Sequence, residues 1–309
     1  MFSFFKRKKS LLPVPEWASF FTQEEFSRFI DIVNRYFEKK QIEIVHDDGV
    51  IRFKNESAEF ENLGLSNLCQ ICNQTKKYRW KSLIYGHFNG MKKAEAFNEE
   101  FNKNSHDFSF SKPYLGVRIY STEHSFILDD TLTIGQHVVD GIFAMLVFDF
   151  PNSVVNVRPE DTIQWNKNYE ELFEIGLQNI RNGYKYKVFK QKFVNFNVWI
   201  ANADHFFTAN IIFDLSKKQQ LLGAKGALVG IPHRHTVVIY PIESLEVLEV
   251  IKYLIIFIRK LYSEGPGSIS ENLFWYFENE VTNLPYEADG SDLNFSPPDT
   301  FIDALNSLE

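Results

Sequence analysis

Most β-rich runs in this sequence come in neighbouring groups joined by short turns, and they do not alternate regularly with helical segments. Antiparallel strands can be joined by as few as two residues, whereas parallel strands need a long crossover connection. The pattern therefore predicts an α+β fold, with an antiparallel or mixed sheet packed by several helices. The expected strands are residues 42–45, 50–53, 115–120, 142–150, 154–157, 186–194, 196–201, 208–214, 226–231, 236–242 and 273–277.

The first expected helix has clear start signals. Thr22 and Glu25 match a capping box, in which each side chain accepts from the other residue's backbone amide. Apolar residues then recur at helical spacing from Phe26 to Phe37 and predict one buried face, with helix to about Lys39. Further helices are expected over residues 63–75, 80–102, 158–183 (with a restart at Asn168) and 245–262.

Shifts in composition divide the chain. A basic run at 6–9 precedes two prolines, a polar stretch covers 103–112, and residues 285–298 are rich in Pro and Gly. We therefore predict a basic flexible tail (1–15), a helix-rich N-terminal part with a β-hairpin (16–110), a sheet-rich α+β part (111–285) and a loop-like tail (286–309).

The overall charge limits the classes of partner. The 309 residues carry 33 basic and 40 acidic side chains, for a net charge of −7. This balance favours solubility and argues against a broad surface for nucleic-acid phosphates. One local exception is the stretch at 76–81, where basic and aromatic residues alternate and could form a nucleic-acid binding site. We expect no nucleic-acid partner.

The N-terminus predicts the compartment. Apolar residues precede Lys6-Arg7-Lys8-Lys9, the reverse of a secretory signal, and no apolar stretch reaches the ~18–20 residues needed to span a bilayer. We expect a cytoplasmic protein with no transmembrane segment. Weak contact between the basic tail and an anionic membrane surface stays open.

Cys69 and Cys72 form a C-x-x-C pair inside an expected helix. A redox pair is typical of a helix start beside a βαβ unit, and a four-cysteine zinc site needs a second pair that this sequence lacks. We interpret both as buried structural thiols.

The chemically unusual segment is Pro232-His233-Arg234-His235. In a strand, residues two apart face the same side, so His233 and His235 could bind one metal ion, although a site needs a third ligand. Alternatively, Pro232 bends the chain and both histidines are partly exposed turn residues. Arg234 could bind a carboxylate or phosphate group of a ligand, or it could form an ordinary salt bridge. Distant third ligands would be His124, His137 with Asp140, and His205 with Asp204.

No G-x-S-x-G elbow, phosphate-binding P-loop or dinucleotide fingerprint occurs in the sequence. Adjacent carboxylates such as Asp129-Asp130 point to different faces and fit solvated turns. We therefore expect no catalytic residues and no cofactor. His233, Arg234 and His235 are the candidate binding residues.

Two segments carry a resemblance. Residues 226–240, around Pro232-His233, resemble the late strand–Pro-His–strand segment of the YtpQ-like bacterial family, whose function is unknown. Residues 155–179 resemble a helix of the same family. The resemblance covers roughly residues 114–262. Gly176 and Ile180 stand where that helix has Ala and Leu, and His235 stands where an acidic or polar residue is more usual. The resemblance implies a cytosolic α+β fold, no assigned activity and no family metal site at the two histidines.

Two functions follow as expectations. The first is a non-enzymatic protein-binding or accessory factor, possibly neutralising, because catalytic motifs are absent and aromatic residues, including 31 Phe, suit interface hot spots. A coding bias toward Phe would explain the same abundance. The second is a metal-dependent hydrolase centred on His233 and His235.

Overall fold

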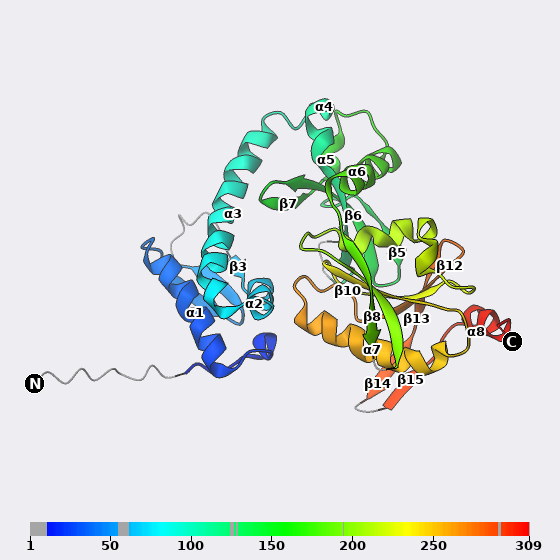
Figure 1. Cartoon of the computed structure of the whole chain (residues 1–309). Coiled ribbons are helices and arrows are strands. Elements are labelled where there is room, and N and C mark those ends of the chain that lie inside the picture. Colours follow the sequence, from blue (N-terminus) through cyan, green and yellow to red (C-terminus); the bar gives the residue numbers. More distant parts are fainter. Residues whose placement is uncertain are drawn as a thin grey trace, which may run out of the picture. The chain divides into compact units, whose positions relative to one another are not determined.

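A computed structural model describes residues 11–54, 62–123, 127, 129–193, 195–289 and 292–308, so the basic run at 6–9 and His124 lie outside the described residues. The chain divides into two compact units, Met1–Lys92 and Lys93–Glu309 (Figure 1). The boundary falls inside α3 (Trp80–Asn102), not in the polar stretch at 103–112. Helices and antiparallel sheets build both units, which confirms the predicted α+β class.

The first unit surrounds the predicted capped helix. It contains η1 (Glu16–Ala18), α1 (Gln23–Glu38), the three-stranded sheet β1 (Ile44–Asp47), β2 (Val50–Phe53) and β3 (Asn62–Gly64), then α2 (Ser66–Asn73), η2 (Lys77–Arg79) and the first part of α3. The capping box is present, with Glu25 N donating to Thr22 Oγ1 at 3.3 Å and Thr22 N to Glu25 Oε2 at 2.8 Å. Positive φ at Asp48 and Gly49 confirms the predicted hairpin turn.

Residues 62–64 form a strand instead of the start of the predicted helix. Leu63 pairs with Ile51 of β2, and α2 starts only at Ser66. Pairing with a distant strand overrides local helical spacing, which is why the sequence pattern misplaced this helix start.

The second unit contains two main sheets. The first has the order β4 (Leu115–Ser121), β6 (Ile142–Phe150), β5 (Gly135–Val139), with β7 (Ser153–Asn156) also paired to β6. The second has the order β13 (Glu280–Leu284), β12 (Leu273–Phe277), β10 (Ala227–His233), β11 (Thr236–Pro241), β9 (Phe196–Asn202), β8 (Lys187–Phe193). The remaining elements are α4 (Phe108–Ser111), η3 (Lys112–Tyr114), α5 (Pro159–Thr162), α6 (Tyr169–Gly183), η5 (Thr208–Lys217), η6 (Gln219–Leu221), α7 (Val247–Glu264), the hairpin β14 (Tyr286–Asp289) and β15 (Asp292–Phe295), and α8 (Asp299–Asn306).

Helices and the other sheet cover the six-stranded sheet. The long helix α7 runs along one face and buries its apolar stripe there (Figure 1). On the other face, η5 and residues Ile119 and Ile142 of the four-stranded sheet join one core. The helix α6 crosses β4 so closely that a Cβ on Gly176 would lie 2.9 Å from the carbonyl carbon of Gly116. These contacts bring β4, η5 and the β10–β11 turn into one region.

Two expectations from the sequence are wrong in this unit, and two strands were not expected. Residues 208–217 form the helix η5, because a short apolar run fits a buried helix as well as a strand. Residues 286–309 hold β14, β15 and α8 instead of a loop-like tail, since Phe301 and Leu305 bury against the core beside Trp275. The strands β5 and β13 were missed because most of their residues are exposed or only half-buried, so they show no regular apolar pattern.

Among the helices in the described ranges, none combines the length and apolar character needed to cross a membrane.

Candidate functional site

The segment with unusual chemistry closes the β10–β11 hairpin. His233 is the last residue of β10 and pairs with Thr236, while Arg234 and His235 form the two-residue turn. Pro232 sits where the register between β10 and β11 shifts, and its carbonyl accepts from Ile269 N at 2.9 Å. His233 is buried, with 5% of its surface exposed, so the expectation that both histidines are partly exposed turn residues holds only for His235. We call residues 233–235 the His-Arg-His turn.

Hydrogen bonds fix both imidazole rings. His235 Nδ1 donates to Ala203 O at 3.2 Å, which leaves His235 Nε2 to accept from Arg234 Nε at 3.1 Å. His233 Nδ1 accepts from His235 N at 3.3 Å. A neutral imidazole has one nitrogen lone pair to offer, and here each lone pair already accepts a hydrogen bond.

This geometry does not favour the two-histidine metal site. Both lone pairs that a metal ion would need are taken within the turn itself. In the part of the chain that the structure describes, no three His, Cys, Asp or Glu side chains gather closely enough to hold a metal ion. His205 lies near His235, but its Nε2 donates to Lys185 O and its Nδ1 accepts from Phe207 N, so it is not placed as a third ligand. Within the described residues, His137 does not join the turn in such a group either.

Arg234 is held on three sides. Its guanidinium carbon lies 4.3 Å from the centre of the Phe206 ring, and its backbone N–H donates to Gly267 O at 3.1 Å. A Cβ on Gly267, whose φ is +70°, would lie 2.7 Å from Arg234 Cδ. The Gly265-Pro266-Gly267 loop after α7 therefore provides the space in which the arginine side chain lies.

A second arginine, Arg118 on β4, reaches the same aromatic ring. Its guanidinium carbon lies 4.5 Å from the Tyr120 ring and 5.5 Å from the Phe206 ring. Arg118 and Tyr120 share a strand face because they are two residues apart. The Phe206 ring also contacts His235 edge-on, at 5.6 Å between ring centres. We call Arg118 and Arg234 the arginine pair.

The arginine pair has no carboxylate partner among the residues that the structure describes. The arginines that do form ion pairs there are others: Arg35, Arg52, Arg158, Arg181 and Arg259. Arg118 Nε is buried and donates no hydrogen bond to any residue that the structure describes. The aromatic rings offset part of the cost of two half-buried cations, but they provide no in-plane oxygen for the N–H groups.

Burial and like charges lower the pKa values of the three residues of the His-Arg-His turn. Burial, and then the charge of Arg118, lowers the pKa of Arg234 to about 10. Burial is the largest cause that lowers the pKa of His233 to about 3, and the neighbouring groups His235 and Arg234 lower it further. Burial, and then the charge of Arg234, lowers the pKa of His235 to about 4. At neutral pH Arg234 therefore keeps its charge, while both histidines of the turn are neutral.

Sequence reasoning found the turn but missed Arg118. The available signal was a charged residue inside Leu115–Ser121, a strand whose other residues are mostly buried. That pattern marks an arginine that the fold must accommodate, but it does not identify Arg234 as its neighbour.

The other sequence candidates have structural roles. Cys69 and Cys72 are free and buried in α2, as predicted. Burial raises the pKa of both thiols, that of Cys72 to about 12, so neither is a reactive thiolate at neutral pH. In the basic stretch at 76–81, Lys77 pairs with Glu25 at 2.7 Å, and Trp80 is buried.

Searches against models of protein families, curated proteins and solved structures found no match to this chain. The resemblance to the YtpQ-like family remains a prediction from the two sequence segments.

Proposed function

We propose that this protein is a non-enzymatic binding protein and that its arginine pair holds an anionic group, a carboxylate or a phosphate, presented by a protein partner. The observation that carries the proposal is the convergence of two half-buried guanidiniums on Phe206 without a carboxylate in the described residues. A cytoplasmic location is part of the proposal, supported by the two unpaired thiols, because free thiols are typical of a reducing compartment.

Electrostatics supports binding of an oxyanion. Two like charges in a partly desolvated site repel each other, and an anion between them would replace that repulsion with attraction. Guanidinium groups present forked N–H donors that match carboxylate and phosphate oxygens. Hydrogen bonds to charged groups contribute roughly 1.5–3 kcal/mol each, so a few of them would outweigh the cost of ordering a small anionic group.

The cluster is also pre-organised for binding. Phe206, His235 and the Gly267 backbone hold Arg234, so its side chain loses little further freedom when an anion arrives. The neutral histidines act as supports: His235 accepts from Arg234 and leaves the guanidinium's terminal nitrogens for other acceptors. Because both imidazole lone pairs are engaged, neither ring is placed as a general base, which supports a binding role over catalysis.

An Arg118→Met variant distinguishes a binding role from a purely structural one. Methionine fills similar space and packs well against aromatic rings, and it removes both the charge repulsion and the unpaired Nε. We expect Arg118→Met to raise the free energy of unfolding in phosphate-free buffer by about 1 kcal/mol. Phosphate should then stabilise the wild type and leave the variant nearly unchanged.

Urea unfolding with and without phosphate measures both effects. Arg79→Met is the matched control, because Arg79 is exposed and lies over Tyr78 without a carboxylate partner among the described residues. It should change stability by less than about 0.5 kcal/mol and keep the phosphate response. A clear loss of stability in Arg118→Met without phosphate, with an unchanged phosphate response, would show that the arginine is structural and overturn the proposal.

A further inference from the structure

The strand β8 lies at an edge of the six-stranded sheet, and no strand among the described residues pairs with its outer side. Its seven residues pair with β9 in an unbroken register, from Lys187 opposite Asn202 to Phe193 opposite Phe196. In an edge strand, the backbone N–H and C=O groups of alternate residues point away from the sheet and can pair with another extended segment. The strand β13, at the opposite edge, has only five residues. The edge at β8 is therefore the longer of the two.

Edge strands are commonly protected from further pairing by proline, by a β-bulge or by lysine. The strand β8 contains no proline, and its register with β9 has no shift. Its lysines oppose pairing with a second copy of the same strand, because like charges would then lie opposite each other. The same lysines favour pairing with a strand that carries acidic residues.

Positive charge is concentrated around this edge, although the whole chain has a net charge of −7. No acidic residue occurs between Glu174 and Asp204, and this interval holds five basic residues: Arg181, Lys185, Lys187, Lys190 and Lys192. The three lysines of β8 form no ion pair with a carboxylate in the described ranges. The edge therefore matches an acidic partner by charge.

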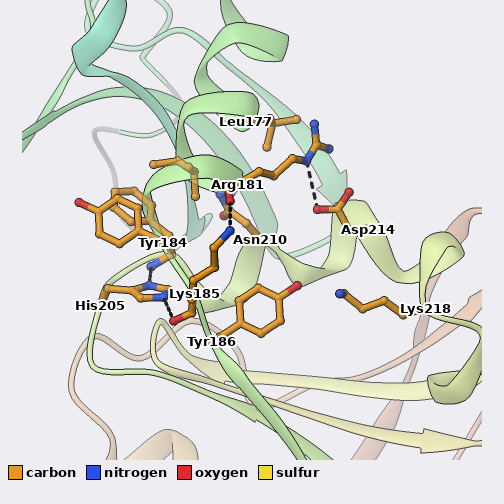
Figure 2. A pocket seen from close by; sticks show the side chains of 11 residues that line it. Leu177, Arg181, Tyr184, Lys185, Tyr186, His205, Asn210, Asp214 and Lys218 are labelled. Carbon is orange, nitrogen blue, oxygen red and sulfur yellow. Dashed lines mark hydrogen bonds and ion pairs between the residues drawn. The ribbon is translucent and has the colours of Figure 1, made fainter.

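The segment that leads into β8 is also basic, and internal contacts hold it in place. Arg181, Lys185 and Lys218 line a cavity of about 310 Å³ beside Tyr186, the residue that precedes β8 (Figure 2). Lys185 Nζ donates to Arg181 O at 3.0 Å, and Arg181 Nε pairs with Asp214 at 3.1 Å. The start of the edge is therefore fixed before a partner arrives, which lowers the entropy cost of binding.

The two sides of β8 differ in character. Phe189 and Phe193 lie on the side that faces α7, because their partners on β9 pack in the core beneath that helix. Phe189 is 43% exposed, and the ring of Phe193 packs on Phe257 with 4.6 Å between ring centres. Lys190 and Lys192 lie on the other side of the strand and are exposed. A strand added at this edge would therefore have apolar neighbours on one side and basic neighbours on the other.

We propose that β8 binds an extended acidic segment of a partner protein as an additional strand of the sheet. Backbone hydrogen bonds to the outer side of β8 provide affinity, and the alternating side chains provide specificity. Acidic side chains of the added strand lie beside Lys190 and Lys192, and its apolar side chains lie beside Phe189 and Phe193. The inference does not depend on the function proposed for the arginine pair, because the two sites use different residues.

Titration calorimetry tests the proposal with the peptide acetyl-Glu-Val-Glu-Val-Glu-Val-Glu-amide, which has the same length as β8. We expect one peptide to bind per chain. The peptide acetyl-Lys-Val-Lys-Val-Lys-Val-Lys-amide should not bind, because its charges repel the lysines of β8. The acidic peptide with every backbone N–H methylated should not bind either, because it cannot donate hydrogen bonds to the edge.

Hydrogen exchange locates the added strand. The acidic peptide should slow the exchange of backbone amides in β8 and leave the exchange in β13, the other edge, unchanged. Slow exchange of the β8 amides in the protein alone, becoming slower as the protein concentration rises, would show that a second copy covers the edge. That result would overturn the proposal.

Three variants test the side-chain contacts. The double variant Lys190→Gln, Lys192→Gln should bind the acidic peptide about tenfold more weakly, because two cross-strand charge pairs are lost. The control Lys112→Gln removes an exposed lysine of η3, outside the sheet, and should leave the affinity unchanged. Arg234→Gln should also bind the peptide like the wild type, whereas weaker binding would place the peptide at the arginine pair and overturn the proposal.

The remaining outcomes are equally decisive. No binding of the acidic peptide, equal binding of the acidic and basic peptides, or full binding of the methylated analogue would each overturn the proposal. An unchanged affinity in the double lysine variant would do the same. None of these four results bears on anion binding by the arginine pair.

Discussion

Lowering the pH from 7 to 5 should reduce the free energy of unfolding by about 3 kcal/mol, chiefly through the two histidines of the His-Arg-His turn. In the folded protein the pKa is lowered from 6.5 to about 3 for His233 and to about 4 for His235, burial being the largest cause. The unfolded chain therefore binds more protons than the folded one below pH 6.5. The stability that these groups contribute is complete above pH 6.5 and is lost as the pH falls toward 4 and 3.

Urea unfolding at pH 5, 6 and 7 measures this dependence. Each histidine contributes a slope of about 1.4 kcal/mol per pH unit in the lower part of this window. Asp149 and Asp161, whose pKa burial raises, bind protons in the folded state and so lessen the loss. His235→Gln should remove about one histidine's share of the slope, whereas the exposed His106→Gln should not. A flat pH dependence would contradict the buried, neutral state of the turn.

Gly265→Ala should destabilise the protein by about 2–3 kcal/mol. Gly265 has an ordinary negative φ of −88°, so the constraint is space and not backbone conformation. A Cβ there would lie 2.1 Å from His233 Cδ2, and the ring cannot simply turn away, because it is buried and its Nδ1 accepts from His235 N. The displaced ring would disturb the hairpin turn that carries Arg234.

Gly183→Ala is the matched control for this substitution. Gly183 ends α6 in the same unit, and an added Cβ would meet nothing within 4 Å. Alanine there should leave stability unchanged or raise it slightly, since it has the better helix propensity. Thermal and urea unfolding of both variants give the comparison. Equal stability of Gly265→Ala and the wild type would mean that the loop does not pack against the turn as described.

Much of the local structure could be predicted from the sequence because its signals are local. The Thr22 cap, the Asp48-Gly49 turn and the Asn168 helix start each depend on a few neighbouring residues. The prediction failed where distant segments decide. Residues 208–214 form a helix that packs in the core between two sheets, and Phe301 packs beside Trp275. Sequence spacing alone reveals neither contact.

The candidate site shows the same division. The His-Arg-His turn stood out because Pro-His-Arg-His is chemically unusual between two apolar strands. The meeting of Arg234 with Arg118 could not be predicted, because Arg118 lies on a strand of one sheet, Arg234 lies in a turn of the other sheet, and both contact Phe206 on a third segment. The lone pairs of the two histidines are engaged in hydrogen bonds, whereas the two arginines have no acid partner among the described residues. The arginines are therefore the better candidates for binding.

The most direct test of the account is calorimetric titration of inorganic phosphate, with succinate in parallel, into the wild type and three variants. The account predicts one phosphate or carboxylate site per chain, about tenfold weaker in Arg118→Gln and in Arg234→Gln, because each loses a charge-assisted donor. Preference for one of the two anions would identify the group that the partner presents. Arg79→Gln, which removes an exposed arginine, should bind like the wild type. Equal affinity in all four proteins, or no binding of either anion to the wild type, would contradict the central claim.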